Sequence, residues 1–436
     1  MHRAHRRLAA LLAVAALAAP ACALSWHTAS AQAATGPLGG LNIPGLGALS
    51  SPAAADHAIR IASKMRARVV RVDFPWSLFE PTGPTLDPAA LARADRLLAD
   101  SSAAGIKVVA TVASTPCWAS SAPAADRAGC ASGNTDGAGA WPPSDPADYA
   151  AFLNALVARY GTKITAIEVW NEPDQSNEDY FAGPNKARNY AAVVRAAYPA
   201  VKAANPNVLV LAGSLVGSNG NFLRALYAAG MKGYYDGLSV HFYNLTLASL
   251  RAIHEAQLAN GDPKPLWLDE FGWTSCWPRR RVEQEQACVT RRTQALNLRD
   301  SIREMARAPY LAAAMVYKLE DSHGEDFGSV TTGGSRKPSF GALSEAFDRP
   351  FGPFSRVTLH LSRRGSHVVA AGSGPVGDFM ELEAFQGTRL RYRALFTQDR
   401  FNRYSVPLPA LLGTHGLRVR VFQYWTGASR AATRSI

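Results

Sequence analysis

Between residues 39 and 347, eight short apolar runs alternate with eight longer, Ala-rich or amphipathic segments. This alternation constrains the fold more than any other feature of the chain. The runs predicted as strands are residues 40–43, 69–73, 107–112, 164–170, 208–212, 237–242, 265–270 and 313–317. The predicted helices are residues 52–65, 87–104, 145–159, 185–204, 219–229, 246–258, 283–306 and 338–347. Repeated β–α units favour a parallel sheet, and eight of them favour closure, so we predict an α/β fold, a (β/α)8 TIM barrel.

The helical pattern ends near Arg-Pro-Phe-Gly-Pro at residues 349–353. After it come short alternating runs at residues 357–361, 367–371, 379–385, 389–396, 404–408 and 417–424. Short strands separated by turn residues are typical of a β-sandwich. We therefore expect the barrel to occupy residues 36–348 and a small C-terminal all-β domain, a β-sandwich, to occupy residues 351–436.

The first 33 residues read as a secretory signal peptide. Arg3, Arg6 and Arg7 precede an apolar stretch at residues 8–21, and small residues at 31–33 or 29–31 offer a cleavage site. The Arg pair leaves the twin-arginine route open beside the general one, and Cys22 leaves lipid anchoring open. No internal run reaches the ~18 apolar residues of a membrane span. We expect a secreted, extracellular protein.

Four cysteines remain in the exported part of the chain, an even number that suits an oxidising compartment. Three pairings are possible, and we favour the local one, which closes two short loops: Cys117–Cys130 and Cys276–Cys288. No Cys or His spacing in the sequence resembles a metal site, so we expect neither a metal nor an organic cofactor.

The chain carries a formal net charge of +12, and the charge is unevenly placed. From residue 351 onward there are 12 basic and 4 acidic residues, which leaves +8 (12 − 4) in that segment. Such an excess suits an anionic envelope polymer as partner, and it equally suits simple solubility. No nucleic-acid motif is present, and we expect a monomer that binds no nucleic acid.

Two of the predicted strands end in a glutamate, Glu172 after the fourth and Glu270 after the seventh. In a barrel of this type the functional site lies at the carboxyl ends of the strands, so both glutamates should face one mouth. Retaining glycosidases need such a pair, because one carboxyl protonates the leaving oxygen while the other attacks the anomeric carbon.

The sequences around these glutamates resemble those of clan A glycoside hydrolases. Trp-Asn-Glu-Pro at residues 170–173 is similar to the acid/base strand of that clan, and Leu-Asp-Glu-Phe-Gly-Trp at 268–273 to its nucleophile strand. Within the clan the chain looks most like family 39 and related exopolysaccharide hydrolases, with support from residues 115–118 and 337–338. The resemblance implies that Glu172 is the acid/base, Glu270 the nucleophile, and Asn171 a ligand of the sugar 2-hydroxyl.

Further site candidates lie on neighbouring strands. Arg71 points from a buried strand, and a cation there would keep Glu270 charged. His241 and Tyr243 share one face of the sixth strand, and the resemblance has Tyr243 donating to Glu270. Aromatic faces suit sugar rings, so the sugar-stacking candidates are Trp118, Trp273 and Tyr317. Each of these residues also has a purely structural interpretation.

Three expectations concern the acidic groups themselves. The site should raise the pKa of Glu172, because it must donate a proton. Asp269 should point away from Glu270 by strand alternation, and Glu168 should be structural, since it lies deeper in its strand.

We predict a secreted retaining glycoside hydrolase that cleaves β-glycosidic bonds in a poly- or oligosaccharide by double displacement. The alternative is a catalytically inactive, glycan-binding barrel at the cell envelope. A Schiff-base lyase or aldolase is a third option, with Lys318 as its lysine, but no group that would lower the pKa of that lysine is evident. The sugar and its linkage stay open.

Overall fold

The computed structural model describes residues 36–133, 135–177, 180–243, 247–277, 288–322, 324–376, 380–412, 415–423 and 431–436. The predicted signal peptide lies outside these residues. Within the described ranges, no helix has both the length and the apolar character that crossing a membrane requires.

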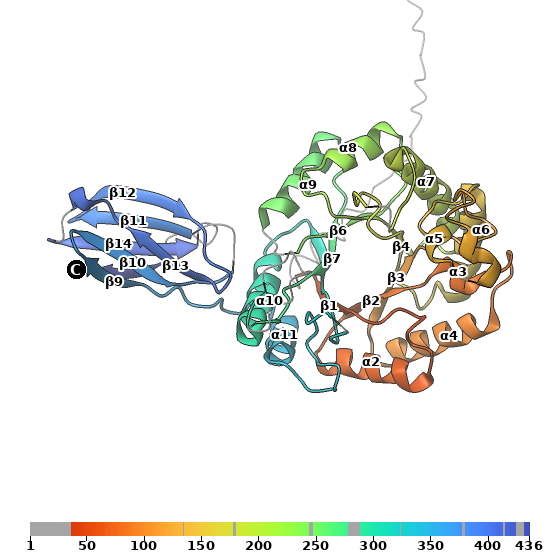
Figure 1. Ribbon diagram of the computed structural model, residues 1–436, viewed down its shortest axis with the longest axis horizontal. Coiled ribbons are helices and arrows are strands. Elements are labelled where there is room, and N and C mark those ends of the chain that lie inside the picture. The colour runs from red at the N-terminus through yellow and green to blue at the C-terminus, as the bar shows by residue number, and fades with distance from the viewer. Residues whose placement is uncertain are drawn as a thin grey trace, which may run out of the picture. The chain divides into compact units, whose positions relative to one another are not determined.

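Eight parallel strands close into a barrel in sequence order, which confirms the predicted fold (Figure 1). They are β1 (Leu38–Asn42), β2 (Val69–Asp73), β3 (Lys107–Val112), β4 (Ala166–Val169), β5 (Leu209–Leu215), β6 (Gly237–His241), β7 (Leu266–Phe271) and β8 (Leu311–Val316). The ring closes through pairing of β1 with β8.

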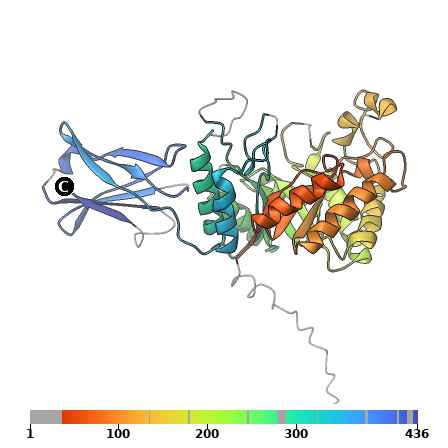
Figure 2. The same cartoon turned by 90° about the horizontal axis from the view of Figure 1, so that it is seen from below.

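Helices cover the outside of the barrel, as both views show (Figures 1 and 2). The main ones are α2 (Pro52–Lys64), α4 (Pro88–Ala103), α6 (Pro146–Tyr160), α7 (Lys186–Ala204), α8 (Asn221–Ala228), α9 (Leu247–Ala259), α10 (Arg291–Met305) and α11 (Pro338–Asp348). Shorter pieces are α3 (Trp76–Phe79), α5 (Asp136–Gly139) and η1 (Ala128–Ser132). The predicted residues 283–287, before α10, lie outside the described residues.

Local sequence explains where several helices begin. Ser51, Asp87 and Asp145 each accept a hydrogen bond from a backbone N–H of the following turn. A proline follows each of them directly, and proline suits a first helical position because its missing N–H would have no partner there.

The barrel interior holds an apolar layer that includes Val69, Val109, Ala166, Leu211 and Trp267. Because side chains alternate along a strand, residues two positions further on also point inward. For four of these five strands the next residue is polar or charged (Arg71, Thr111, Glu168 and Asp269), and these four side chains form the floor of the site described below.

The predicted C-terminal all-β region consists of two antiparallel sheets, β13-β10-β9 and β12-β11-β14-β15. Their strands are β9 (His360–Arg364), β10 (His367–Ser373), β11 (Met380–Gln386), β12 (Arg389–Phe396), β13 (Arg403–Pro407), β14 (Leu417–Gln423) and β15 (Ala432–Ser435). Their inward residues, among them Leu382, Val419 and Val421, share one apolar core. Strand β15 lies beyond residues 417–424, the last strand that the sequence pattern predicted.

Both predicted disulfides are present, Cys117–Cys130 and Cys276–Cys288. Each joins two parts of the same loop region at the carboxyl end of the barrel, after β3 and after β7 respectively.

Candidate active site

The carboxyl ends of the barrel strands surround a cavity of about 750 Å³. Its lining residues come from β2, β3, β4, β6, β7, β8 and the loops that follow them: Arg71, Asp73, Pro75, Thr111, Ala113, Ser114, Asn171, Glu172, Gln175, Tyr180, Tyr243, Glu270, Tyr317, Glu325 and Phe327. The structure therefore brings the two predicted catalytic glutamates into one cavity, although they are far apart in the sequence.

Glu172 and Glu270 face each other across a short gap. One carboxyl oxygen of each lies within 4.8 Å of the other and of a His241 ring nitrogen. The two residues are 7% and 8% exposed, so each is buried except where it meets the cavity. Both Trp170 and Glu172 have positive φ angles, 72° and 45°. The chain thus leaves β4 in a left-handed conformation, and such positions cluster at functional sites.

Glu270 is held by two of the predicted partners. Arg71 Nη1 lies 2.8 Å from Glu270 Oε1, and the Tyr243 hydroxyl donates to Oε2 at 2.6 Å. Burial, followed by the charge of Glu270, holds the pKa of Tyr243 well above its usual value, so the phenol remains a donor. These two contacts fix the orientation of the Glu270 carboxylate at the edge of the cavity.

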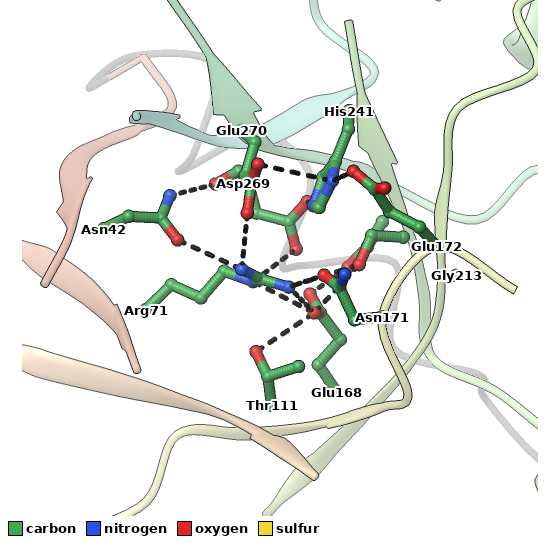
Figure 3. A network of polar contacts seen from close by, with 12 residues as sticks. Asn42, Arg71, Thr111, Glu168, Asn171, Glu172, Gly213, His241, Asp269 and Glu270 are labelled. Carbon is green, nitrogen blue, oxygen red and sulfur yellow. Dashed lines mark hydrogen bonds and ion pairs between the residues drawn. The ribbon is translucent and has the colours of Figure 1, made fainter. Parts of the chain in front are cut away.

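Arg71 is itself the centre of a buried network (Figure 3). Its guanidinium donates to Glu168 Oε1 at 2.6 Å, to Asn171 Oδ1 at 2.7 Å and to Asn42 Oδ1 at 3.1 Å. Burial alone would lower its pKa, but the surrounding carboxylates outweigh burial and raise it. Asn171 is therefore oriented from below, which leaves its amide nitrogen free to face a ligand in the cavity.

Glu168 lies beneath the cavity and is fully buried. Besides Arg71, it accepts hydrogen bonds from three hydroxyls, those of Thr111, Ser214 and Ser239, at 2.9–3.1 Å. Burial, with Asp269 as a further cause, raises its pKa to about 7. Its position agrees with the expected structural role.

The expectation that Asp269 points away from Glu270 is wrong. Trp267 points into the barrel, so alternation carries Asp269 inward as well. The pairing of β6 with β7 then shifts register, and His241 lies opposite Glu270. This β-bulge turns two consecutive carboxylates toward one site, where Asp269 Oδ2 lies 3.7 Å from Arg71 Nε.

The prediction that the site raises the pKa of Glu172 is also wrong for the ligand-free protein. Burial acts in that direction, but hydrogen bonds from His241 and Gln175 and the charge of His241 outweigh it and lower the pKa. His241 Nδ1 lies 2.7 Å from Glu172 Oε1. Although burial opposes it, the neighbouring carboxylates raise the pKa of His241 to about 10.

Glu172, His241 and Glu270 are residue types that also occur in metal sites. Both oxygens of Glu270 already have partners, since Arg71 Nη1 lies 2.8 Å from Oε1 and the Tyr243 hydroxyl donates to Oε2. We therefore do not assign these three side chains as metal ligands.

The predicted aromatic residues divide into two groups. Tyr317 lines the cavity, and its ring lies 5.8 Å from that of Tyr243 and 5.6 Å from that of Phe327. Among the described residues, Trp118 and Trp273 are not part of the lining. Trp118 packs edge-on against Trp76 and donates to the backbone of Glu80, and Trp273 is 4% exposed.

Sequence reasoning missed three lining residues in particular, Tyr180, Glu325 and Phe327. All three lie in irregular loops, after β4 and after β8, where no periodic pattern indicates the direction of a side chain. Glu325 forms an ion pair with Lys318, which explains why its pKa is lowered despite partial burial.

Comparisons with known proteins agree with this architecture. The sequence profile of the family Cellulase (glycosyl hydrolase family 5) matches residues 31–294, more than half of the chain. A search of curated proteins gives no match. The family match and the solved structures described next bear out the predicted relationship to clan A and to family 39.

Solved glycosidases share the fold at low sequence identity. A family 39 glycoside hydrolase from Bacteroides cellulosilyticus WH2 is similar with a TM-score of 0.55 and 19% identity, covering 87% of this chain and 80% of its own. A family 39 β-xylosidase from Caulobacter crescentus gives 0.53 and 17%, covering 86% and 93%. An endoxylanase of family 30 from Clostridium papyrosolvens C71 gives 0.50 and 14%, covering 86% and 94%. The chain thus belongs to the cellulase family of glycosyl hydrolases, family 5, and is a glycoside hydrolase.

Proposed function

We propose that this protein is a retaining glycoside hydrolase, with Glu270 as nucleophile and Glu172 as acid/base. The observation that carries the proposal is the gap between the two carboxyl groups, whose nearest oxygens lie within 4.8 Å. Retaining enzymes have carboxyl groups ~5–5.5 Å apart, whereas inverting enzymes leave room for a water molecule at ~6.5–9.5 Å.

The reaction has two steps. In the first, a Glu270 oxygen bonds to the anomeric carbon, the glycosidic C–O bond breaks, and Glu172 protonates the leaving oxygen. In the second, Glu172 takes a proton from water, the water oxygen bonds to the same carbon, and Glu270 leaves as a carboxylate. The amide of Asn171 borders the cavity and would bind the sugar 2-hydroxyl in both transition states.

The substrate class that suits the cavity is a β-linked poly- or oligosaccharide. Tyr243, Tyr317 and Phe327 form an aromatic cluster at one side of the lining, where their rings can pack against the C–H groups of a sugar. The names of the Caulobacter β-xylosidase and the Clostridium endoxylanase give the same bond configuration for two proteins of similar fold. We propose no particular sugar.

Replacing Glu172 with Gln tests the acid role. Hydrolysis of a sugar-linked or alkyl glycoside should slow by about 10²–10⁴-fold, since its leaving oxygen needs a proton. An aryl glycoside with a strongly acidic phenol needs no such help in the first step, so its kcat/KM should change little. Glu255→Gln, on the exposed face of α9, is the control. An equal loss on both substrate types would mean that Glu172 is not the acid. Wild-type protein that binds polysaccharide but cleaves no glycoside would favour the inactive, glycan-binding alternative.

We also propose that residues 1–33 export the protein, that residues 36–348 form the catalytic domain, and that residues 351–436 form an accessory domain. Two disulfides support an oxidising location, because such bonds rarely persist in the cytoplasm. We expect the protein to act as a monomer.

One face of the sheet β12-β11-β14 carries basic residues, which supports the anionic polymer suggested by the charge of residues 351–436. Arg391 and Arg393 on β12 and Arg418 and Arg420 on β14 flank β11 on the face opposite the apolar core. Arg393 pairs with Glu381 and Arg420 with Glu383, whereas in the described part of the chain no ion pair joins Arg391 or Arg418 to a carboxylate. These four residues form what we call the arginine face. We propose that it binds an acidic polysaccharide of the cell envelope.

A double substitution, Arg391→Gln with Arg418→Gln, tests this proposal. Cosedimentation with a uronate polysaccharide should fall at least about tenfold at low salt, because each lost cation removes a screened attraction. The same net charge change on the barrel helices, in Arg60→Gln with Arg96→Gln, should leave binding near wild type. Equal losses in both double variants would show that only overall charge matters and would overturn the proposal.

A further inference from the structure

His241 is enclosed by three carboxylates, which reach it from two sides of its ring (Figure 3). Nδ1 lies 2.7 Å from Glu172 Oε1 and 3.5 Å from Glu270 Oε2. Nε2 lies 3.3 Å from Asp269 Oδ1. The histidine is 2% exposed and Asp269 is fully buried, so water contributes little to this contact.

Asp269 is placed there by the backbone. Because of the bulge in β7, His241 of β6 pairs with Glu270 and not with Asp269. Asp269 precedes Glu270 in the strand and lies beneath the imidazole. In the described part of the chain, the cations within 4 Å of the Asp269 carboxylate are His241 and Arg71, and the carboxyl of Glu168 also interacts with it. A buried carboxylate is costly unless such partners compensate its charge.

Resting on the proposed function, we propose that Asp269 is a positioning residue that keeps His241 protonated, and that His241 stores the proton which Glu172 donates. With Nε2–H held toward Asp269, the second ring proton lies on Nδ1 and faces Glu172. At 2.7 Å the proton can pass between Nδ1 and Oε1 without any movement of the chain.

The charges balance through both steps. Before reaction, Glu270 and Glu172 are anions and His241 is a cation, which sums to one negative charge. When the glycosyl–Glu270 ester forms, the His241 proton passes through Glu172 to the leaving oxygen. Glu270 and His241 are then both neutral and Glu172 is an anion, again one negative charge. In the second step, the proton taken from water returns through Glu172 to His241 as Glu270 becomes an anion again.

This balance matters because the site is buried. A change of net charge is unfavourable in a buried site of low dielectric constant, and a proton that moves in step with the covalent bond avoids that change. It also reconciles the lowered pKa of Glu172 with an acid role, since the acidic proton is kept on its neighbour in the resting protein.

Other titratable groups also act on His241. Glu172 reaches it from the end of β4, Glu270 and Asp269 from β7, and Asp73 acts on it from β2. Arg71, also on β2, is the opposing cation. Of these, Asp269 is the group that contacts Nε2 and lies outside the cavity lining, so its replacement leaves the lining residues in place.

The test is Asp269→Asn, followed through the pH dependence of kcat/KM on a substrate with a poor leaving group. Loss of this anion should move the alkaline limb down by about one pH unit or more, because a charge within ~4–6 Å shifts a pKa by ~1–3 units. The acidic limb should move much less. Asp262→Asn is the control, since Asp262 is also buried and has an oxygen without a hydrogen-bond partner, but lies before β7, away from the cavity.

A second measurement needs no active variant. The ¹⁵N spectrum of His241 in the wild-type protein, assigned by comparison with His241→Asn, should show both ring nitrogens protonated at pH 8. A neutral ring at that pH, or a D269N profile with an unmoved alkaline limb, would overturn the inference. If the wild-type protein hydrolyses with retention in either case, the proposed function stands while the proton store fails. If no glycoside is cleaved, the proposed function and the proton store both fail, whatever the protonation of the His241 ring.

Discussion

Replacing Glu270 with Ala should reduce kcat on aryl glycosides by on the order of 10⁴–10⁶-fold, as expected when a covalent nucleophile is removed. Added azide should restore part of the rate, because it fits the space left by the carboxylate beside Arg71. The product should then be a glycosyl azide of inverted configuration, since one displacement replaces two. Initial rates with and without azide, with product analysis by NMR, provide the measurement.

The control for this variant is Glu255→Ala, on the exposed face of α9, which should have wild-type activity. A Glu270→Ala protein that folds and still turns over substrate at the wild-type rate would contradict the assignment of the nucleophile. Loss of activity without azide rescue would leave Glu270 necessary but would weaken its covalent role.

Replacing Arg71 with Met should lower the free energy of unfolding by about 3–5 kcal/mol near neutral pH, since it leaves buried carboxylates without their cation. Arg71 lies within 4 Å of Glu168, Asp269 and Glu270, and its side chain is 3% exposed. In the variant the folded-state pKa of Glu168 rises further above its unfolded value, and the pKa of Asp269 loses one of the charges that hold it below its unfolded value. The penalty is therefore largest at neutral pH and shrinks as the pH falls and the carboxyls become protonated.

Denaturant unfolding at pH 7 and pH 4.5 measures this effect. Arg68→Met is the matched control, because Arg68 directly precedes β2, is only partly buried and donates to the backbone oxygen of Pro37. Its loss should cost about 1 kcal/mol and should not depend on carboxyl protonation. A pH-independent penalty in Arg71→Met would mean that packing, and not charge compensation, is its main contribution.

Most of the fold could be predicted because the barrel repeats one pattern. Strands β2, β3 and β12 begin and end where the apolar pattern places them. Strand β4 ends earlier than predicted, since Trp170 already has a left-handed backbone that the apolar run does not reveal. Strand β15 was missed, because Ala432–Ser435 is polar and pairs only at the sheet edge.

The direction of a site residue could be predicted only where side chains alternate regularly between the two faces of a strand. Arg71 on β2 and Tyr243 after β6 line the cavity, and His241 at the end of β6 contacts Glu172. Alternation failed for Asp269, because a β-bulge depends on how neighbouring strands pair and leaves no mark in the sequence of one strand. It gave no direction for Trp118 and Trp273, which lie in loops whose packing the sequence does not encode locally.

The pKa of Glu172 depends on a contact between distant segments. The motif at residues 170–173 indicates an acid, but the neighbour that lowers its pKa, His241, is 69 residues away in the chain. Chemistry can thus be assigned from local residue types, whereas electrostatics requires the assembled barrel.

The central claim is that Glu172 and Glu270 cleave a glycosidic bond by two successive displacements at one carbon. The most direct test follows the anomeric proton of the first-formed product by ¹H NMR, in the interval before mutarotation, as the wild-type protein hydrolyses a β-glycoside. The account predicts that the β-anomer appears first and converts to the equilibrium mixture only afterwards. First appearance of the α-anomer would demonstrate a single displacement by water and would contradict the account.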